Sequence, residues 1–134
     1  MKIVVDTNVL VSGIFFTGPP FRILQAWRDG RVTIVLCPEI LAEYRRIGEL
    51  LAGQFPVIDL AAFLELLTIN SEIVSAHLLP KSVCADPDDD MFLGCALAAK
   101  AKIIVSGDKH LLKVEKYHGI EILTPRRFVD TFLW

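Results

Sequence analysis

The stretch DPDDDMFLGCALAAKAKIIVSGD (residues 86–108) contains the strongest indication of the fold. It opens with four carboxylates in five residues, continues through an apolar segment, and ends with the β-branched run KIIVS before Asp108. An acidic start followed by Ala and Leu is typical of a helix, because negative charge is stabilised at a helix N-terminus. We therefore predict a helix at residues 89–100, capped by Asp88 or a neighbour, and a buried strand at residues 102–106.

The rest of the chain alternates between strands and helices in the same way. Further strands are predicted at residues 2–5, 32–36, 72–76 and 120–124. Further helices are predicted at residues 20–29, 38–51, 58–69, 109–114 and 125–132. This order predicts an α/β fold: a three-layer α/β/α sandwich around a central, mainly parallel sheet. The length fits one domain that spans residues 1–134.

Composition limits the classes of protein to consider. A hydrophobic content of 53% suits a sheet covered on both faces and leaves apolar surface, including the terminal segment FVDTFLW, for a homodimer or another protein partner. The net charge of −2 argues against a general polyanion binder, so nucleic acid would need a local basic patch. Without a membrane-span run or signal-peptide pattern, we expect a cytoplasmic protein with Cys37, Cys84 and Cys95 as reduced core residues.

Acidic residues fall where the predicted strands end. Asp6 ends the first strand and Asp108 follows another, and ligands of parallel α/β sheets bind at this carboxyl edge. The helix after residues 86–90 begins at the same edge, and Glu43 lies in the apolar stripe of another helix that starts there. Taken singly, each acid could be a helix cap or a surface residue. Together we expect them to surround a hard divalent cation, Mg²⁺ or Mn²⁺, because close like charges repel.

Three segments resemble the motifs of the PIN-domain nucleases. They are IVVDTNVLVSG (residues 3–13), EILAEYRRI (residues 39–47) and DPDDDMFLGCALAAKAKIIVSGDKHLL (residues 86–112). The likeness is greatest to the prokaryotic toxins of toxin–antitoxin pairs (VapC-like). The resemblance covers nearly the whole chain, and it implies a PIN-like fold, RNA cleavage with one or two Mg²⁺ or Mn²⁺ ions, and a cognate antitoxin protein.

The resemblance also implies roles for individual residues. It implies that the catalytic and metal-binding acids are Asp6, Glu43, Asp89 and Asp108, with Asp90 as the alternative to Asp89. Asp86 is expected to support these acids or to form the turn before Pro87. The residues expected to orient a carboxylate or a phosphate oxygen, or simply to cap helices, are Thr7, Asn8 and Ser106. The residues that could contact the RNA backbone, or be ordinary solvated charges, are Arg45, Arg46, Lys109 and Lys113.

Two other functions stay open from the sequence. A PIN-like interaction module would keep the fold with an idle site, although the retained acids argue against it. A receiver-like Mg²⁺-binding α/β domain would also gather acids at a sheet edge. That class is expected to carry an acid pair after its first strand, where this chain has the single Asp6.

Overall fold

The sheet confirms the predicted architecture. The computed structural model describes residues 1–84 and 89–133, within which the sheet has the strand order β3-β2-β1-β4-β6-β5. The strands are β1 (Lys2–Val5), β2 (Thr33–Leu36), β3 (Glu72–Ile73), β4 (Ile103–Val105), β5 (Lys116–Tyr117) and β6 (Ile120–Leu123). In this described part β5 and β6 pair antiparallel, and every other neighbouring pair is parallel.

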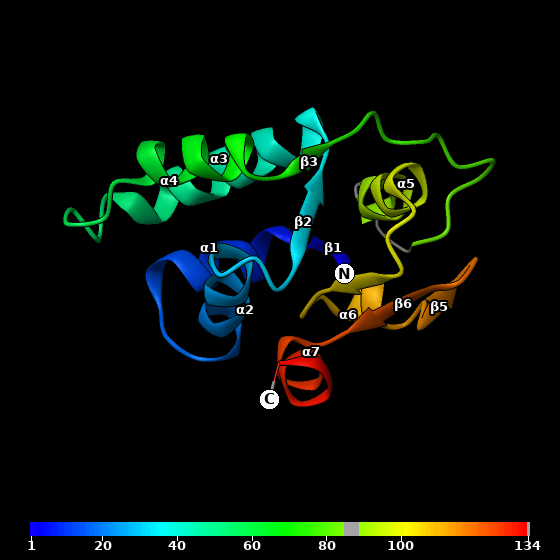
Figure 1. The fold of residues 1–134 in the computed structure, drawn as a ribbon. Coiled ribbons are helices and arrows are strands. Elements are labelled where there is room, and N and C mark those ends of the chain that lie inside the picture. Colours follow the sequence, from blue (N-terminus) through cyan, green and yellow to red (C-terminus); the bar gives the residue numbers. More distant parts are fainter. Residues whose placement is uncertain (85–88, 134) are drawn as a thin grey trace.

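Helices cover both faces of the sheet. They are α1 (Thr7–Phe15), α2 (Pro19–Arg28), α3 (Pro38–Ala52), α4 (Leu60–Ile69), α5 (Asp90–Ala99), α6 (Lys109–Leu112) and α7 (Pro125–Phe132). Figure 1 shows α3, α4 and α5 above the sheet and α2 and α7 below it. Helix α1 leaves the end of β1 and packs against both α2 and α3. The three-layer arrangement is the one that the strand–helix alternation predicts.

The core explains why the central segments have no polar face. The side chains of Ile3, Val4 and Val5 in β1 have no exposed surface, because helices cover both sides of this strand. Helix α5 is buried almost all round, so its sequence lacks the period of a half-exposed helix. All three cysteines are buried and free, which confirms that they are core residues.

Three details differ from the sequence prediction. Helix α1 occupies a segment to which we assigned no element, and strand β5 was also missed. A two-residue turn at His118 and Gly119, with φ angles of 48° and 83°, joins β5 to β6 as a tight hairpin. The described part of the terminal segment FVDTFLW does not form the predicted apolar surface, because Phe128, Val129 and Leu133 are buried in the core.

The helices are short compared with the thickness of a bilayer. Among residues 1–84 and 89–133, no single helix is long and apolar enough to cross a membrane. Helices α1 and α2 reach that length and composition together, but the two are bent by 86° relative to each other.

Candidate active site

A cavity at the carboxyl edge of the sheet gathers acidic side chains from four places in the sequence. This cavity, called the carboxylate cavity below, has a volume of about 630 Å³. The carboxylates in its described lining are Asp6, Glu39, Glu43, Asp89 and Asp108, and the basic residue is Arg46. The acids follow β1 and β4, lie in the first two turns of α3, or precede α5 as its N-cap residue. The convergence expected from the topology is therefore present.

Buried polar groups concentrate at this same place. Apart from Tyr44 and the cysteines, the polar or charged residues buried in the described part of the chain are Asp6, Thr7, Asp89 and Ser106, which are 5, 5, 8 and 0% exposed. Burying an ionised or polar group costs free energy unless hydrogen bonds or charges compensate for it. Because these unfavourably buried groups cluster at the carboxylate cavity, we identify this cavity as the candidate active site.

Asp6 lies at the centre of the site and also caps α1. Its Oδ1 accepts a hydrogen bond of 2.7 Å from the backbone N–H of Thr7. Its Oδ2 accepts one of 2.7 Å from the hydroxyl of Ser106. Burial raises the pKa of Asp6, and the negative charges of Asp108 and Glu43 add to the rise, while the two hydrogen bonds oppose it. Burial is thus the main cause of the raised Asp6 pKa, and Asp108 and Glu43 are close enough to contribute to it.

Ser106 connects the first and last acids of the site. Its Oγ donates to Asp6 and accepts a hydrogen bond of 2.9 Å from the backbone N–H of Asp108. The Oδ1 of Asp108 in turn accepts a hydrogen bond of 2.7 Å from the backbone N–H of His110, so Asp108 caps α6. Capping a helix and lining the cavity are thus compatible roles for both aspartates.

The neighbours Asp89 and Asp90 point to different surroundings. Asp89 lines the carboxylate cavity. Asp90 accepts hydrogen bonds of 2.9 Å from Ser82 Oγ and from the backbone N–H of Cys84, and weaker ones from the N–H of Val83. Partial burial would raise the pKa of Asp90, but these hydrogen bonds outweigh it and hold the pKa below its usual value. Of the two, Asp89 therefore has the position of a site residue, and Asp90 holds a turn.

Asp86, Pro87 and Asp88 lie outside the described residues. The expected role of Asp86 therefore stays a prediction.

Glu43 reaches the cavity paired with an arginine from its own helix. Arg46 Nη2 lies 2.8 Å from Glu43 Oε1, and Arg46 Nε lies 3.1 Å from Oε2. Arg45, Lys109 and Lys113 are exposed and are not among the described lining residues of the cavity. Of the four basic residues proposed from the sequence, Arg46 is the one that the structure brings to the site.

The remaining small residues meet the site in different ways. Asn8 is exposed and lines the cavity, whereas Thr7 is buried beside Asp6. The Thr7 hydroxyl makes no hydrogen bond within the described part of the chain. A buried hydroxyl without a partner is unusual, and it adds an oxygen donor beside the acids.

The carboxylate cavity offers oxygen donors of the kind that bind a divalent ion. Among the described residues, no three acidic, histidine or cysteine side chains already stand close enough together to hold an ion. Repulsion between like charges favours such separation, and Glu43 is held by Arg46. The donors themselves are carboxylate oxygens with the Thr7 hydroxyl nearby, and hard ions such as Mg²⁺ and Mn²⁺ prefer oxygen ligands. The chemistry of the site fits such an ion after side-chain rotation.

Comparison with known proteins agrees with this geometry. The sequence profile of the PIN domain matches residues 2–110, a range that includes the acids of the carboxylate cavity. The chain belongs to the PIN-domain family. It is also similar to an uncharacterized protein, MJ1680, of Methanocaldococcus jannaschii. The two are 30% identical over 151 aligned positions, which cover 98% of this chain and 92% of the relative. No solved structure matches the chain significantly.

Family membership gives the site a general meaning. PIN domains are generally nucleases, hence hydrolases, and they typically use divalent metal ions. The receiver-like alternative is set aside, because the matched family accounts for most of the chain.

A second cavity adjoins the site of this PIN domain. It has a volume of about 380 Å³ and shares Glu39 and Met91 with the carboxylate cavity. His77 and Lys81 are among its other lining residues. The sequence did not indicate this cavity, because residues 77–84 carry no motif and the strand predicted at residues 72–76 extends only over Glu72–Ile73 in the structure.

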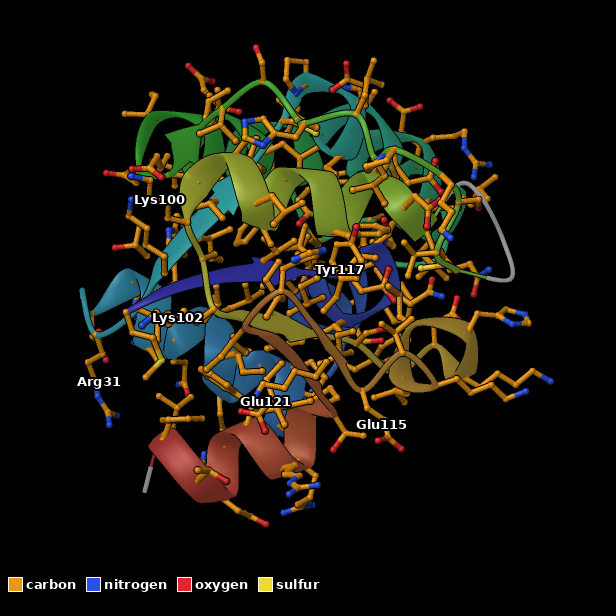
Figure 2. All side chains as sticks on the ribbon, turned by 90° about the vertical axis from the view of Figure 1, so that its right-hand side faces the viewer. Arg31, Lys100, Lys102, Glu115, Tyr117 and Glu121 are labelled. Atoms are coloured by element: carbon orange, nitrogen blue, oxygen red, sulfur yellow. The ribbon has the colours of Figure 1, made fainter. Side chains whose placement is uncertain are left out.

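Other basic residues of the PIN domain lie away from the site. Arg31 and Lys102 precede β2 and β4, and Lys100 ends α5, which places all three at the amino edge of the sheet. Figure 2 shows this group on the side away from the start of α5. These residues therefore do not contribute to the carboxylate cavity.

Proposed function

We propose that this PIN domain is a Mg²⁺- or Mn²⁺-dependent endoribonuclease, and that it is the toxin of a toxin–antitoxin pair. The observation that carries the nuclease proposal is the carboxylate cavity, in which the buried acids Asp6 and Asp89 meet Asp108 and Glu43 at one sheet edge. RNA as the substrate and the toxin role rest on the resemblance of the sequence motifs.

The proposed mechanism assigns a role to each group. Asp6, Asp89 and Asp108 would hold the ion, with Glu43 bound directly or through water. A divalent ion bound there supplies charge neutralisation of the phosphate and activation of a water molecule for in-line attack. Ser106 keeps the Asp6 carboxylate in position through its 2.7 Å hydrogen bond.

The second cavity gives the RNA chain a route beyond the cleaved phosphate. Because it shares Glu39 and Met91 with the carboxylate cavity, a nucleotide next to the cleavage site would enter it without a break. Its lining is mainly apolar, which suits a base, and Lys81 lies where it could meet a backbone phosphate. Single-stranded RNA is the form that can place a base there.

We also propose a homodimer and an antitoxin as partners, with one PIN domain over residues 1–134 and a cytoplasmic location. Apolar side chains exposed on α3, on α4 and in the loop between them support a protein partner: Leu50 is 67%, Val57 94% and Ile69 69% exposed. Light scattering at micromolar concentration tests the dimer, and a monomer there would contradict it.

Cleavage of mixed single-stranded RNA tests the nuclease proposal. The protein is expected to cut RNA with Mn²⁺ or Mg²⁺, and to stop when EDTA removes the ion. Glu43→Gln should lower kcat by about tenfold or more, because it removes a charge from the site. Glu49→Gln, on the exposed part of the same helix, is the matched control and should cut normally. Equal cleavage by both variants would contradict the role of Glu43, and cleavage that survives EDTA would contradict the metal dependence. If the wild type does not cleave RNA with either ion, the nuclease proposal is wrong and a non-catalytic PIN-like module is favoured.

A further inference from the structure

Arg46 is the basic residue in the described lining of a cavity that holds five carboxylates. Its guanidinium faces both oxygens of Glu43, at 2.8 and 3.1 Å, in a two-point ion pair across one turn of α3. Each Glu43 oxygen therefore already accepts a hydrogen bond from Arg46. A cation entering the site meets this pair, not a free Glu43 carboxylate.

The ion pair is placed so that it can be broken. The side chains of Arg46 and Glu43 are 64% and 30% exposed, and ion pairs this close to solvent contribute little to stability. Glu43 also acts on Asp6, because its charge contributes to the raised pKa of that residue. A cation that binds Asp6 and Asp108 would attract Glu43 as well. Arg46 and a divalent ion thus compete for one carboxylate.

The displaced guanidinium has a second use in the same cavity. Its planar fork of N–H donors matches the oxygens of a phosphate group as well as those of a carboxylate. Arg46 already lines the cavity, so it needs only side-chain rotation to meet a phosphate bound there. The exposed neighbour Arg45 has no such ion pair and is not among the described lining residues of the cavity.

We propose that Arg46 is an exchangeable counter-ion of Glu43: it competes with the divalent ion for the Glu43 carboxylate and, once displaced, binds a phosphate of the RNA substrate. This inference rests on the proposed nuclease function. It makes an unusual prediction, because loss of Arg46 should strengthen ion binding and weaken substrate binding. A residue with a merely structural role would not change the two in opposite directions.

Mn²⁺ titration without RNA, followed by electron paramagnetic resonance of the free ion, tests the first half. Arg46→Gln should bind Mn²⁺ about two- to fivefold more tightly than the wild type, whereas Arg45→Gln should bind it equally well. The effect of Arg46→Gln should vanish when Glu43 is also changed to Gln, because the pair is then already lost. If Arg46→Gln still strengthens Mn²⁺ binding in the Glu43→Gln background, the positive charge of Arg46 acts on the ion directly. The proposed competition for Glu43 is then wrong.

Steady-state cleavage of RNA at saturating Mn²⁺ tests the second half. Arg46→Gln should raise KM about three- to tenfold while Arg45→Gln leaves KM unchanged. Equal KM values for the two variants would overturn the phosphate contact.

Failure of the underlying function has a different signature. If Asp6→Asn binds Mn²⁺ as well as the wild type does, the proposed metal site is wrong. The proposed competition between Arg46 and the ion then fails as well. If Asp6→Asn weakens Mn²⁺ binding but Arg46→Gln behaves like Arg45→Gln, the metal site stands and the exchange alone is overturned.

Discussion

Replacing Ser106 by Ala removes the hydroxyl that joins two acids of the site. Ser106 has no exposed surface, and its Oγ makes two hydrogen bonds within the site. The lost hydrogen bond to the Asp6 carboxylate, 2.7 Å long, is of the charged kind and contributes about 1.5–3 kcal/mol. The variant also loses the hydrogen bond from the Asp108 N–H to Ser106 Oγ, which adds about 0.5–1.5 kcal/mol to stability. We therefore expect Ser106→Ala to lower the free energy of unfolding by about 2–4 kcal/mol near neutral pH.

The loss should depend on pH in a defined direction. Burial raises the pKa of Asp6, and the Ser106 hydrogen bond opposes that rise, so the variant should have a still higher Asp6 pKa. An acid whose pKa is higher in the folded than in the unfolded protein destabilises the fold as pH rises through the folded pKa. The cost of Ser106→Ala should therefore be largest at neutral pH and shrink as acid protonates Asp6.

Urea denaturation in EDTA, followed by circular dichroism at about pH 7 and about pH 5, measures both quantities. Ser106→Thr keeps the hydroxyl and is the matched variant, which should lose less stability than Ser106→Ala. A loss below about 0.5 kcal/mol, or one that is the same at both pH values, would refute the reasoning about Asp6.

The remaining predictions concern packing, the acidic run and the route of the RNA. Gly94→Ala should cost about 1–3 kcal/mol in urea denaturation, because a methyl group there would collide with the backbone carbonyl of the segment packed on α5, whereas Gly53→Ala meets open space and should be neutral. Asp90→Asn should lower stability by about 1 kcal/mol through its turn yet keep metal-dependent cleavage, and loss of cleavage would show that it is a ligand. Lys81→Gln should raise KM for RNA about threefold in steady-state assays, while Lys102→Gln at the opposite edge should not.

Topology made most of the fold and the convergence of the acids predictable. Asp6 and Asp108 follow parallel strands, so their meeting at one edge requires only that the strands be neighbours. Helix α1 was missed for a physical reason. Its sequence, TNVLVSGIF, has weak helix propensity because it contains several β-branched residues and a glycine. Burial on nearly every side, as at Val9 and Val11, also removes the helical period.

Side-chain direction within the site was harder to predict. Asp89 and Asp90 are adjacent, and the difference between them is set by the turn whose Ser82 hydroxyl and N–H groups bind Asp90. That turn lies in a segment without a recognisable pattern. The spacing of Glu43 and Arg46 permits an ion pair on a helix, but it does not show that the pair faces the cavity. That fact depends on how α3 packs.

The most direct test of the central claim compares two helix-capping aspartates in metal-dependent RNA cleavage. Asp6 caps α1 inside the carboxylate cavity, whereas Asp59 caps α4 away from it, with its carboxylate 3.0 Å from the N–H of Ala62. Asparagine caps helices nearly as well as aspartate, so both Asp→Asn variants should fold. We expect Asp6→Asn to lose at least about a hundredfold in the Mn²⁺-dependent cleavage rate and Asp59→Asn to cut like the wild type. Equal rates for the two variants would contradict the assignment of the carboxylate cavity as the nuclease site.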